Sequence, residues 1–409
     1  MLTVVEAFSG IGSQAKALQR QNIEYEILNT IEWDIAATYA YDIIHNGEQD
    51  SSLYEDYEKA RLLLELNKYG LSLNSKEPIK ETSLKSWPEE ALRKVFFALK
   101  RTKNLGSITD IHEEMLPPRF DVLTYSFPCQ DLSICGAWHG NKSGINRDAG
   151  NRSGMLWEVE RILLERNKSD RELPTFLLME NVNNILSQAH KDNFDEWKGV
   201  LSRLGYLNQV YTLSADKFGS PQKRRRTYMI SVLYGEENKK NALLEYFQHN
   251  NLEYFESNSQ KTIGDVLRTD YSNSIYRKEA DGSNPNDTPS RQKIYQNNDI
   301  VFNGKKVTQE FVNTLTTKQD RNPTAGLIDY PLHGVGKAPY RNFTPRECFM
   351  LMGFDESDFE AVIKNNFYVR KNQQLFSRER LERLAGNSIV VEVLEQIFRQ
   401  INYIKSHIL

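Results

Sequence analysis

Short apolar runs alternate along the chain with stretches in which apolar residues recur every three or four positions. The short runs predict strands, at 2–8, 25–33, 120–127, 175–181, 208–215 and 226–233. The longer pattern predicts helices, at 12–22, after residue 33, at 154–168 and at 193–205. Regular alternation of this kind is typical of a parallel, doubly wound α/β sheet with helices on both faces.

Two segments interrupt the alternation. Residues 47–106 are charged and helix-leaning, which predicts a helical insertion packed on the main domain. Residues 234–341 are rich in Asn, Asp, Ser, Thr and Tyr and have few long apolar runs, which indicates a second, smaller, loop-rich domain. We therefore expect one α/β domain made of 1–233 and 342–409, whose C-terminal helix packs back on it.

Net charge and cysteine spacing limit the partners and the cellular compartment that the chain could have. The formal net charge is −3, so nucleic-acid binding would have to rest on local basic patches. The three cysteines, Cys129, Cys135 and Cys348, form no CxxC pair, which fits a reducing compartment. No stretch approaches the roughly 20 apolar residues of a membrane helix, and the first residues carry no basic leader. We expect an intracellular protein without a membrane segment.

A glycine turn joins the first strand to the first helix. Gly10 and Gly12 allow the backbone to pass close to a ligand, and the helix start exposes free N–H groups. The second strand ends in Glu32 and Trp33, which offer a carboxylate for ribose hydroxyls and an indole for stacking. Ala15 replaces the last glycine of GxGxxG, which disfavours a dinucleotide and leaves a smaller nucleoside, or a purely structural turn.

A cysteine follows the third strand. Pro128 fixes the frame from which Cys129 leaves the strand end, where active sites of doubly wound sheets assemble. A thiolate there would be a nucleophile if a base, cation or dipole lowered its pKa. An inert loop cysteine is the alternative.

A carboxyl and three arginines complete the candidate chemistry. Glu180 ends another strand, where burial would keep its carboxyl protonated. The last strand opens with Arg224, Arg225 and Arg226. Strand alternation places Arg224 and Arg226 on one face, from which they could pair with Glu180 and bind an acceptor oxygen. A solvated charge run is the other interpretation.

These motifs, in this order, resemble those of the cytosine-C5 DNA methyltransferases. The segments are EAFSGIGSQ, EW, SFPCQDLS, RSGMLWE, MENV, QKRRR, PRECFMLMGF and GNSIVVEVL, and the bacterial restriction–modification and CpG-type enzymes are the most similar members. The resemblance covers both ends and most of the main domain. It implies a Rossmann-like methyltransferase domain with a target-recognition domain at 234–341. The implied reaction moves a methyl group from S-adenosyl-L-methionine to C5 of a cytosine flipped out of duplex DNA.

The resemblance also implies residue roles. Cys129 would bond to C6 of cytosine, Glu180 would share a proton at N3, Arg226 would hold O2 and Arg224 would orient Glu180. The residues implied to bind the cofactor are Phe8, Ser9, Gly10, Gly12, Glu32, Trp33, Asp110, Ile111, Pro128, Leu156, Asn387 and Ser388. Those implied to contact DNA are Ser133, Arg152, Thr314, Leu315 and Thr316. No metal is implied, and the base that removes the C5 proton is not identified.

Residues 344–347, TPRE, fit a helix-capping box with proline at the first helical position, so we interpret Arg346 and Glu347 as structural. The resemblance implies a monomer in the bacterial cytoplasm at the nucleoid. A cognate restriction endonuclease, if one exists, would act on the same site without a stable complex. The alternatives are a tRNA cytosine methyltransferase of the same fold, an inactive DNA-binding relative, and a Rossmann dehydrogenase.

Overall fold

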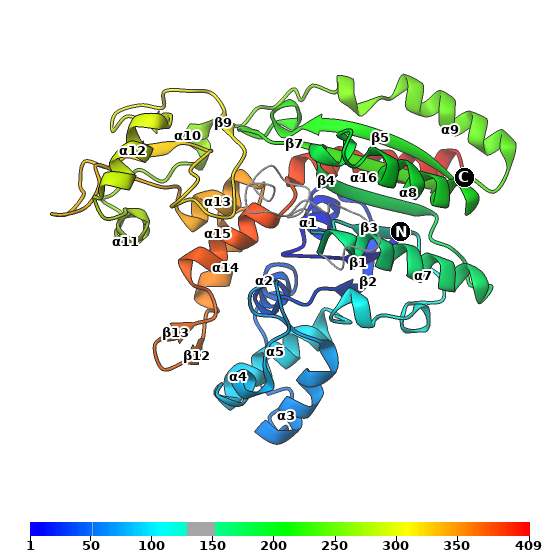
Figure 1. Cartoon of the computed structure of the whole chain (residues 1–409), viewed down its shortest axis with the longest axis horizontal. Coiled ribbons are helices and arrows are strands. Elements are labelled where there is room, and N and C mark those ends of the chain that lie inside the picture. Colours follow the sequence, from blue (N-terminus) through cyan, green and yellow to red (C-terminus); the bar gives the residue numbers. More distant parts are fainter. Residues whose placement is uncertain (51, 129–151) are drawn as a thin grey trace.

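The computed structural model describes residues 1–50, 52–128 and 152–409. Its centre is a six-stranded sheet with the order β2-β1-β3-β4-β7-β5 (Figure 1). The strands are β1 (Leu2–Ala7), β2 (Tyr25–Ile31), β3 (Val122–Tyr125), β4 (Phe176–Val182), β5 (Tyr206–Ser214) and β7 (Arg225–Leu233). All six predicted strands are confirmed, with ends within two residues of the expected ones.

One strand runs against the rest. The pairs β1–β2, β1–β3 and β3–β4 are parallel, whereas β7 is antiparallel to both β4 and β5. The prediction of an all-parallel sheet is therefore wrong for β7. The physical reason is the short connection from β5 to β7, residues 215–224, because a parallel return needs a crossover of about a dozen residues or more.

Helices cover both faces of the sheet, as predicted. Successive strand residues point into different apolar clusters: Val4 and Leu178 face one cluster, and Val5 and Leu177 face the other. The first cluster includes side chains of α1 (Ser13–Arg20), α2 (Ile35–Asn46) and α16 (Val391–His407). The second includes side chains of α7 (Leu156–Lys168) and α8 (Lys191–Arg203). Burial on both faces explains why the strands read as continuous apolar runs.

The insertion forms a helical layer beside α2. Its helices are α3 (Lys59–Leu66), α4 (Glu81–Lys85) and α5 (Glu89–Arg101). Arg101 of α5 donates from Nε to Oδ1 of the buried Asp42 of α2 over 2.6 Å. The insertion also returns to the end of the sheet, because the Ser72 N–H donates to the Trp33 carbonyl at 2.7 Å.

The segment after β7 first packs on the main domain. Helix α9 (Glu237–His249) places Leu243 and Phe247 in the apolar cluster that also contains α16 side chains. The ring of Tyr246 stacks on Tyr403 of α16, with 5.0 Å between centroids.

A separate lobe follows, at the left of Figure 1. It contains short elements: α10 (Ile263–Val266), α11 (Ser274–Ser283), α12 (Pro289–Asn297), β8 (Ile300–Phe302), β9 (Val312–Asn313), β10 (Leu327–Asp329) and β11 (Tyr340–Arg341). Strands β11, β10 and β8 form a small sheet, and β9 pairs in parallel with β6 (Gln222–Lys223) of the main domain. The chain then returns through α13 (Pro345–Leu351), α14 (Glu356–Lys364), a β12–β13 hairpin (Tyr368–Arg370 and Gln373–Gln374) and α15 (Arg378–Asn387).

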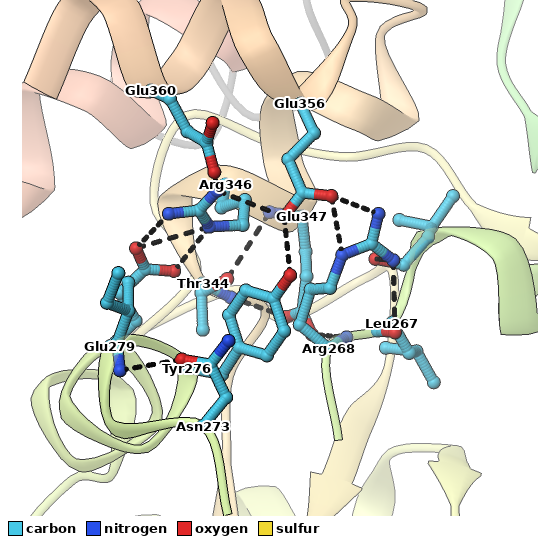
Figure 2. Close-up of polar contacts among 12 residues, drawn as sticks. Leu267, Arg268, Asn273, Tyr276, Glu279, Thr344, Arg346, Glu347, Glu356 and Glu360 are labelled. Atoms are coloured by element: carbon cyan, nitrogen blue, oxygen red, sulfur yellow. Dashed lines mark hydrogen bonds and ion pairs between the residues drawn. The ribbon is translucent and has the colours of Figure 1, made fainter. Parts of the chain in front are cut away.

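A network of ion pairs around the buried Arg346 holds the lobe to these returning helices (Figure 2). Arg346 of α13 is 3% exposed and contacts Glu279 of α11 at 2.8 Å and Glu356 and Glu360 of α14 at 3.0 and 2.9 Å. Glu356 also binds Arg268 at 2.6 Å. The predicted capping box is confirmed, because Thr344 and Glu347 cap each other's backbone N–H groups.

Within the described ranges, no helix is both long enough and apolar enough to cross a membrane.

Candidate active site

The glycine turn at the end of β1 adopts a left-handed backbone conformation, which is strained for most residues other than glycine. Phe8, Gly10 and Gly12 have φ angles of 56°, 56° and 83°. A Cβ atom on Gly12 would lie 2.2 Å from Nε2 of His45, whereas one on Gly10 would have nothing within 4 Å. Gly12 is therefore required both by its φ angle and by close packing against α2.

Glu32 lies against this turn, while its role in binding a ribose stays a prediction. Its carboxylate accepts from the N–H groups of Gly10 at 3.0 Å and Asp34 at 2.8 Å. Burial, and secondarily the charge of Asp34, raise the pKa of Glu32 to about 7. Trp33 is half-buried beside it. The carboxyl of Glu32 thus meets the glycine-lined backbone at the carboxyl ends of β1 and β2, and Trp33 is the next residue along the chain.

The insertion borders the same region, which the sequence analysis missed. A Cβ on Gly70 would lie 2.7 Å from Oδ2 of Asp110, so the insertion passes directly over that carboxyl. Asp110 is exposed, whereas Ile111 and Leu156 are buried in the apolar cluster beneath the sheet. Ile111 and Leu156 have the burial of ordinary core residues, so their cofactor role stays a prediction.

The ends of β3 and β4 are held side by side. The side chain of Asn181 donates to the Phe127 carbonyl over 3.1 Å, one residue before Pro128. Cys129 and Ser133 lie outside the described residues, as does the side chain of Arg152. Their assigned roles therefore stay predictions.

Glu180 and Arg226 form an ion pair near this point. The Nε of Arg226 lies 3.5 Å from Oε1 of Glu180, and both side chains are largely buried. Burial raises the pKa of Glu180, while the charges of Arg226 and Arg224 oppose that rise. Glu180 also lines a small pocket with Gln14 and Tyr125. A carboxyl with a raised pKa can donate a proton to a polar ring, and the guanidinium beside it can donate two parallel N–H hydrogen bonds.

Arg224 has a different environment from the one that strand alternation suggests. It lies between β6 and β7, outside both strands. Its guanidinium donates to the carbonyls of Leu315 at 3.0 Å, Gly386 at 3.0 Å and Ser388 at 3.1 Å. Its charge acts on Glu180, but orientation of Glu180 by Arg224 stays a prediction. These contacts join three segments of the chain: the one around Arg224, the one around Leu315 and residues 386–388. We call this set of contacts the Arg224 tie.

Gln222, quoted in the QKRRR motif but given no role, completes that tie. Its Oε1 accepts from the Leu315 N–H at 2.8 Å, and its Nε2 donates to the Leu351 carbonyl at 3.1 Å. Gln222 and Arg224 thus bind both backbone groups of Leu315, which is fully buried. Gly386 permits the close approach, because a Cβ there would lie 2.8 Å from the Thr316 carbonyl carbon.

The other predicted contacts flank this tie. The hydroxyl of Thr314 donates to the Lys223 carbonyl at 3.1 Å, and that of Thr316 donates to the Asn322 carbonyl at 2.9 Å. Asn387 is exposed at the end of α15, whereas Ser388 is buried and donates to the Leu384 carbonyl at 2.8 Å. In the described ranges, no group of three or more His, Cys, Asp or Glu side chains is arranged to hold a metal ion.

Comparisons with known proteins agree with one another. A family model described as C-5 cytosine-specific DNA methylase matches residues 70–403. The orphan methyltransferase M.SssI of Spiroplasma monobiae is 32% identical over 409 residues, covering 98% of this chain and 97% of that protein. The type II methyltransferase M2.ScrFI of Lactococcus lactis subsp. cremoris is 32% identical over 405 residues, covering 98% and 99%. A solved DNMT2 variant from Spodoptera frugiperda shares the fold, with a TM-score of 0.58 and 16% identity over 98% of this chain and 100% of that chain.

Proposed function

This chain belongs to the C-5 cytosine-specific DNA methylase family and is a DNA cytosine-5 methyltransferase, and from that premise we propose that it uses S-adenosyl-L-methionine and a transient bond between Cys129 and the cytosine ring. Carbon 5 of cytosine is a poor nucleophile, because its electrons belong to an aromatic ring. Addition of a thiolate at C6 turns C5 into an enamine-like carbon that can attack a methyl group. The target base must leave the DNA stack to reach such a site.

The observation that carries this proposal is the Glu180–Arg226 pair. A cytosine attacked at C6 develops negative charge on its ring, and a protonated carboxyl at N3 together with a guanidinium at O2 would absorb it. Burial raises the pKa of Glu180, so its carboxyl holds a proton at a higher pH than an exposed glutamate does. Arg226 keeps Glu180 in place from the neighbouring strand at 3.5 Å.

The glycine turn fits the proposed cofactor. The methionine end would lie over Phe8, Ser9, Gly10 and Gly12, where the positive φ angles turn the backbone sharply. Glu32, which binds the Gly10 N–H, retains lone pairs for ribose hydroxyls. S-adenosyl-L-methionine would supply an electrophilic methyl group on a sulfonium. The remaining assigned contacts are Trp33, Asp110, Ile111, Pro128, Leu156, Asn387 and Ser388.

We further propose that the DNA is a duplex, read within residues 234–341 by the lobe that follows α9, with Ser133, Arg152, Thr314, Leu315 and Thr316 at the interface. M2.ScrFI is named a type II methyltransferase, and M.SssI an orphan methyltransferase. On that similarity we assign this chain to the modification side of a restriction–modification system. A cognate endonuclease would act on the same site without a stable complex. The enzyme would work as a monomer in the bacterial cytoplasm, at the nucleoid.

The test is methyl transfer and covalent capture. Purified protein is incubated with labelled S-adenosyl-L-methionine and either duplex DNA or tRNA, and we expect label in DNA. Label in tRNA alone would favour a tRNA cytosine methyltransferase, and no label in either would favour an inactive relative of this family. Duplexes with 5-fluorocytosine at the target should become trapped on residue 129, and Cys129→Ser should abolish both transfer and trapping while cofactor affinity survives. Bisulfite sequencing of plasmid from an expressing host then gives the target sequence.

A further inference from the structure

A polar groove lies between the lobe and the QKRRR segment, apart from the Glu180 site. It is open to solvent, has a volume of about 510 Å³ and is lined by eight residues, all with polar side chains: one lysine, three asparagines, one aspartate and three threonines. It suits a ligand that presents hydrogen-bond donors and acceptors.

The threonines form a fixed wall of this groove. Thr314 donates to the Lys223 carbonyl and Thr316 to the Asn322 carbonyl. Thr324 donates to the Thr314 carbonyl at 2.6 Å. Because each hydroxyl donates its hydrogen bond to a backbone carbonyl, the three side chains are held in place before any ligand binds.

Other lining side chains remain available. Within residues 1–50, 52–128 and 152–409, the side chains of Asn297, Asp299 and Asn313 make no hydrogen bond or ion pair, and Lys223 contacts only the ring of Phe311, at 5.5 Å. The backbone of Asp299 is nevertheless fixed, because its carbonyl accepts from the Leu327 N–H at 2.8 Å. Gly326, just before β10, allows the two backbones to lie this close, since a Cβ on Gly326 would lie 3.0 Å from the Asp299 carbonyl oxygen. The carboxylate of Asp299 is thus exposed and unpaired, while its backbone is held in place by a hydrogen bond.

The groove borders the segment that leads to the Glu180–Arg226 pair. Lys223 and Asn313 lie on β6 and β9, which pair in parallel across the two lobes. The residue after Lys223 is Arg224, and the first two residues of β7 are Arg225 and Arg226. A ligand in the groove therefore contacts the segment that carries the Glu180 partner.

We propose that this groove receives the edge of a base pair beside the target cytosine, and that Asp299 selects a base with an exposed amino group, N4 of cytosine or N6 of adenine. The inference rests on the proposed function, since it assumes that duplex DNA binds here. A carboxylate only accepts hydrogen bonds and is repelled by phosphates, so in a DNA-binding groove it fits an amino hydrogen on a base. Lys223 has the opposite role, as a contact to phosphate that carries no sequence information.

The experiment selects bound duplexes from a pool with a randomised central segment, for the wild type, Asp299→Asn, Lys223→Gln and the control Glu245→Gln. Glu245 is an exposed carboxylate on α9, away from the lobe (Figure 1). We expect Asp299→Asn to lose about tenfold preference at a single base position, with binding to unrelated duplexes unchanged or stronger. Lys223→Gln should weaken all sequences alike and reduce the salt dependence by about one phosphate contact.

Two results would overturn the inference. One is an Asp299→Asn variant with the wild-type sequence preference, and the other is one that loses affinity equally for every duplex. Methylation of the selected duplex is measured separately. A wild type that selects a sequence but methylates none would contradict the proposed function and leave the groove assignment standing.

Discussion

The Nε atom of Arg226 lies 3.5 Å from Oε1 of Glu180, across two antiparallel strands of an otherwise parallel sheet. The reversal of β7 makes this possible. It brings the beginning of one strand beside the end of β4, so a guanidinium from the start of β7 meets a carboxyl at the end of β4. A parallel β7 would have placed Arg226 at the opposite edge of the sheet.

This pair predicts how activity depends on pH. Burial raises the pKa of Glu180, so the carboxyl stays protonated to a higher pH, and activity should fall as pH rises through that pKa. Glu180→Gln should lower kcat at least 100-fold and remove this alkaline limb, with the fold intact by circular dichroism. Glu180→Ala should lose most of the rate as well. An unchanged alkaline limb in Glu180→Gln would mean that another group titrates.

Arg226→Ala tests the same pair from the other side. The charge of Arg226 lowers the pKa of Glu180, so its removal should move the alkaline limb to higher pH while kcat falls. The measurement is kcat/KM with labelled cofactor over a pH series that starts at 4.5, the ordinary pKa of a glutamate, and rises from there. A limb that moves to lower pH would contradict the ion pair.

Arg224 and Arg225 are neighbours with opposite expectations. Arg224 is buried and donates to three carbonyls in two other segments of the chain, whereas Arg225 is exposed. Arg224→Ala should reduce the free energy of unfolding by about 3 kcal/mol, because it leaves buried carbonyls without a charged donor. Arg225→Ala should change it by less than about 0.5 kcal/mol. Urea unfolding followed by tryptophan fluorescence compares the two, and equal effects would contradict the tie.

Part of this site follows from sequence patterns. The glycine turn and Glu32 could be predicted to meet, because β1 and β2 are adjacent parallel strands whose carboxyl ends share one edge. Glu180 could be placed at the same edge for the same reason. These contacts depend on parallel strands whose carboxyl ends lie at the same edge, and the alternation of apolar runs and helices predicts such strands. The strand order itself is seen only in the fold.

Other contacts depend on geometry that no local pattern carries. The direction of β7 follows from a ten-residue connection whose turn and short strand β6 are not apparent in the apolar pattern. Arg224 falls just outside β7, so strand alternation does not reveal its hydrogen bonds to the carbonyls of Leu315, Gly386 and Ser388. The contact between Gly70 and Asp110 joins an insertion to the main domain across an unpatterned loop. Long-range contacts of this kind become visible only in three dimensions.

The two glycines of the turn give a matched pair of substitutions. Gly12→Ala would place a methyl group 2.2 Å from His45 Nε2 and 2.8 Å from Tyr41 Cε2 at a φ of 83°. The methyl group of Gly10→Ala would meet open space, so this substitution should lower the free energy of unfolding only by the strain of a left-handed alanine, about 1–2 kcal/mol. Gly12→Ala should cost about 3 kcal/mol and weaken cofactor affinity at least tenfold. Thermal unfolding and calorimetry with S-adenosyl-L-methionine measure both quantities, and similar losses in the two variants would contradict the packing argument.

Glu6 predicts a pH dependence of stability that is separate from catalysis. Its side chain is fully buried in β1, and burial raises its pKa to about 7, with a smaller opposing effect from Tyr41. The folded chain therefore holds this proton more tightly than the unfolded chain, whose glutamate has a pKa near 4.5. The stabilising effect is complete below about pH 4.5 and is lost as pH rises to about 7.

The loss from this one group amounts to about 3 kcal/mol across that interval. In Glu6→Gln the group no longer titrates, so the decline in unfolding free energy from pH 5.0 to pH 7.5 should be smaller than in the wild type by most of that amount. Glu26→Gln, an exposed position on the neighbouring strand β2, is the control and should follow the wild-type curve. Urea unfolding at the two pH values gives the comparison. Parallel curves for the wild type and Glu6→Gln would mean that Glu6 is already ionised in the folded chain at pH 5, which its complete burial beside Tyr41 argues against.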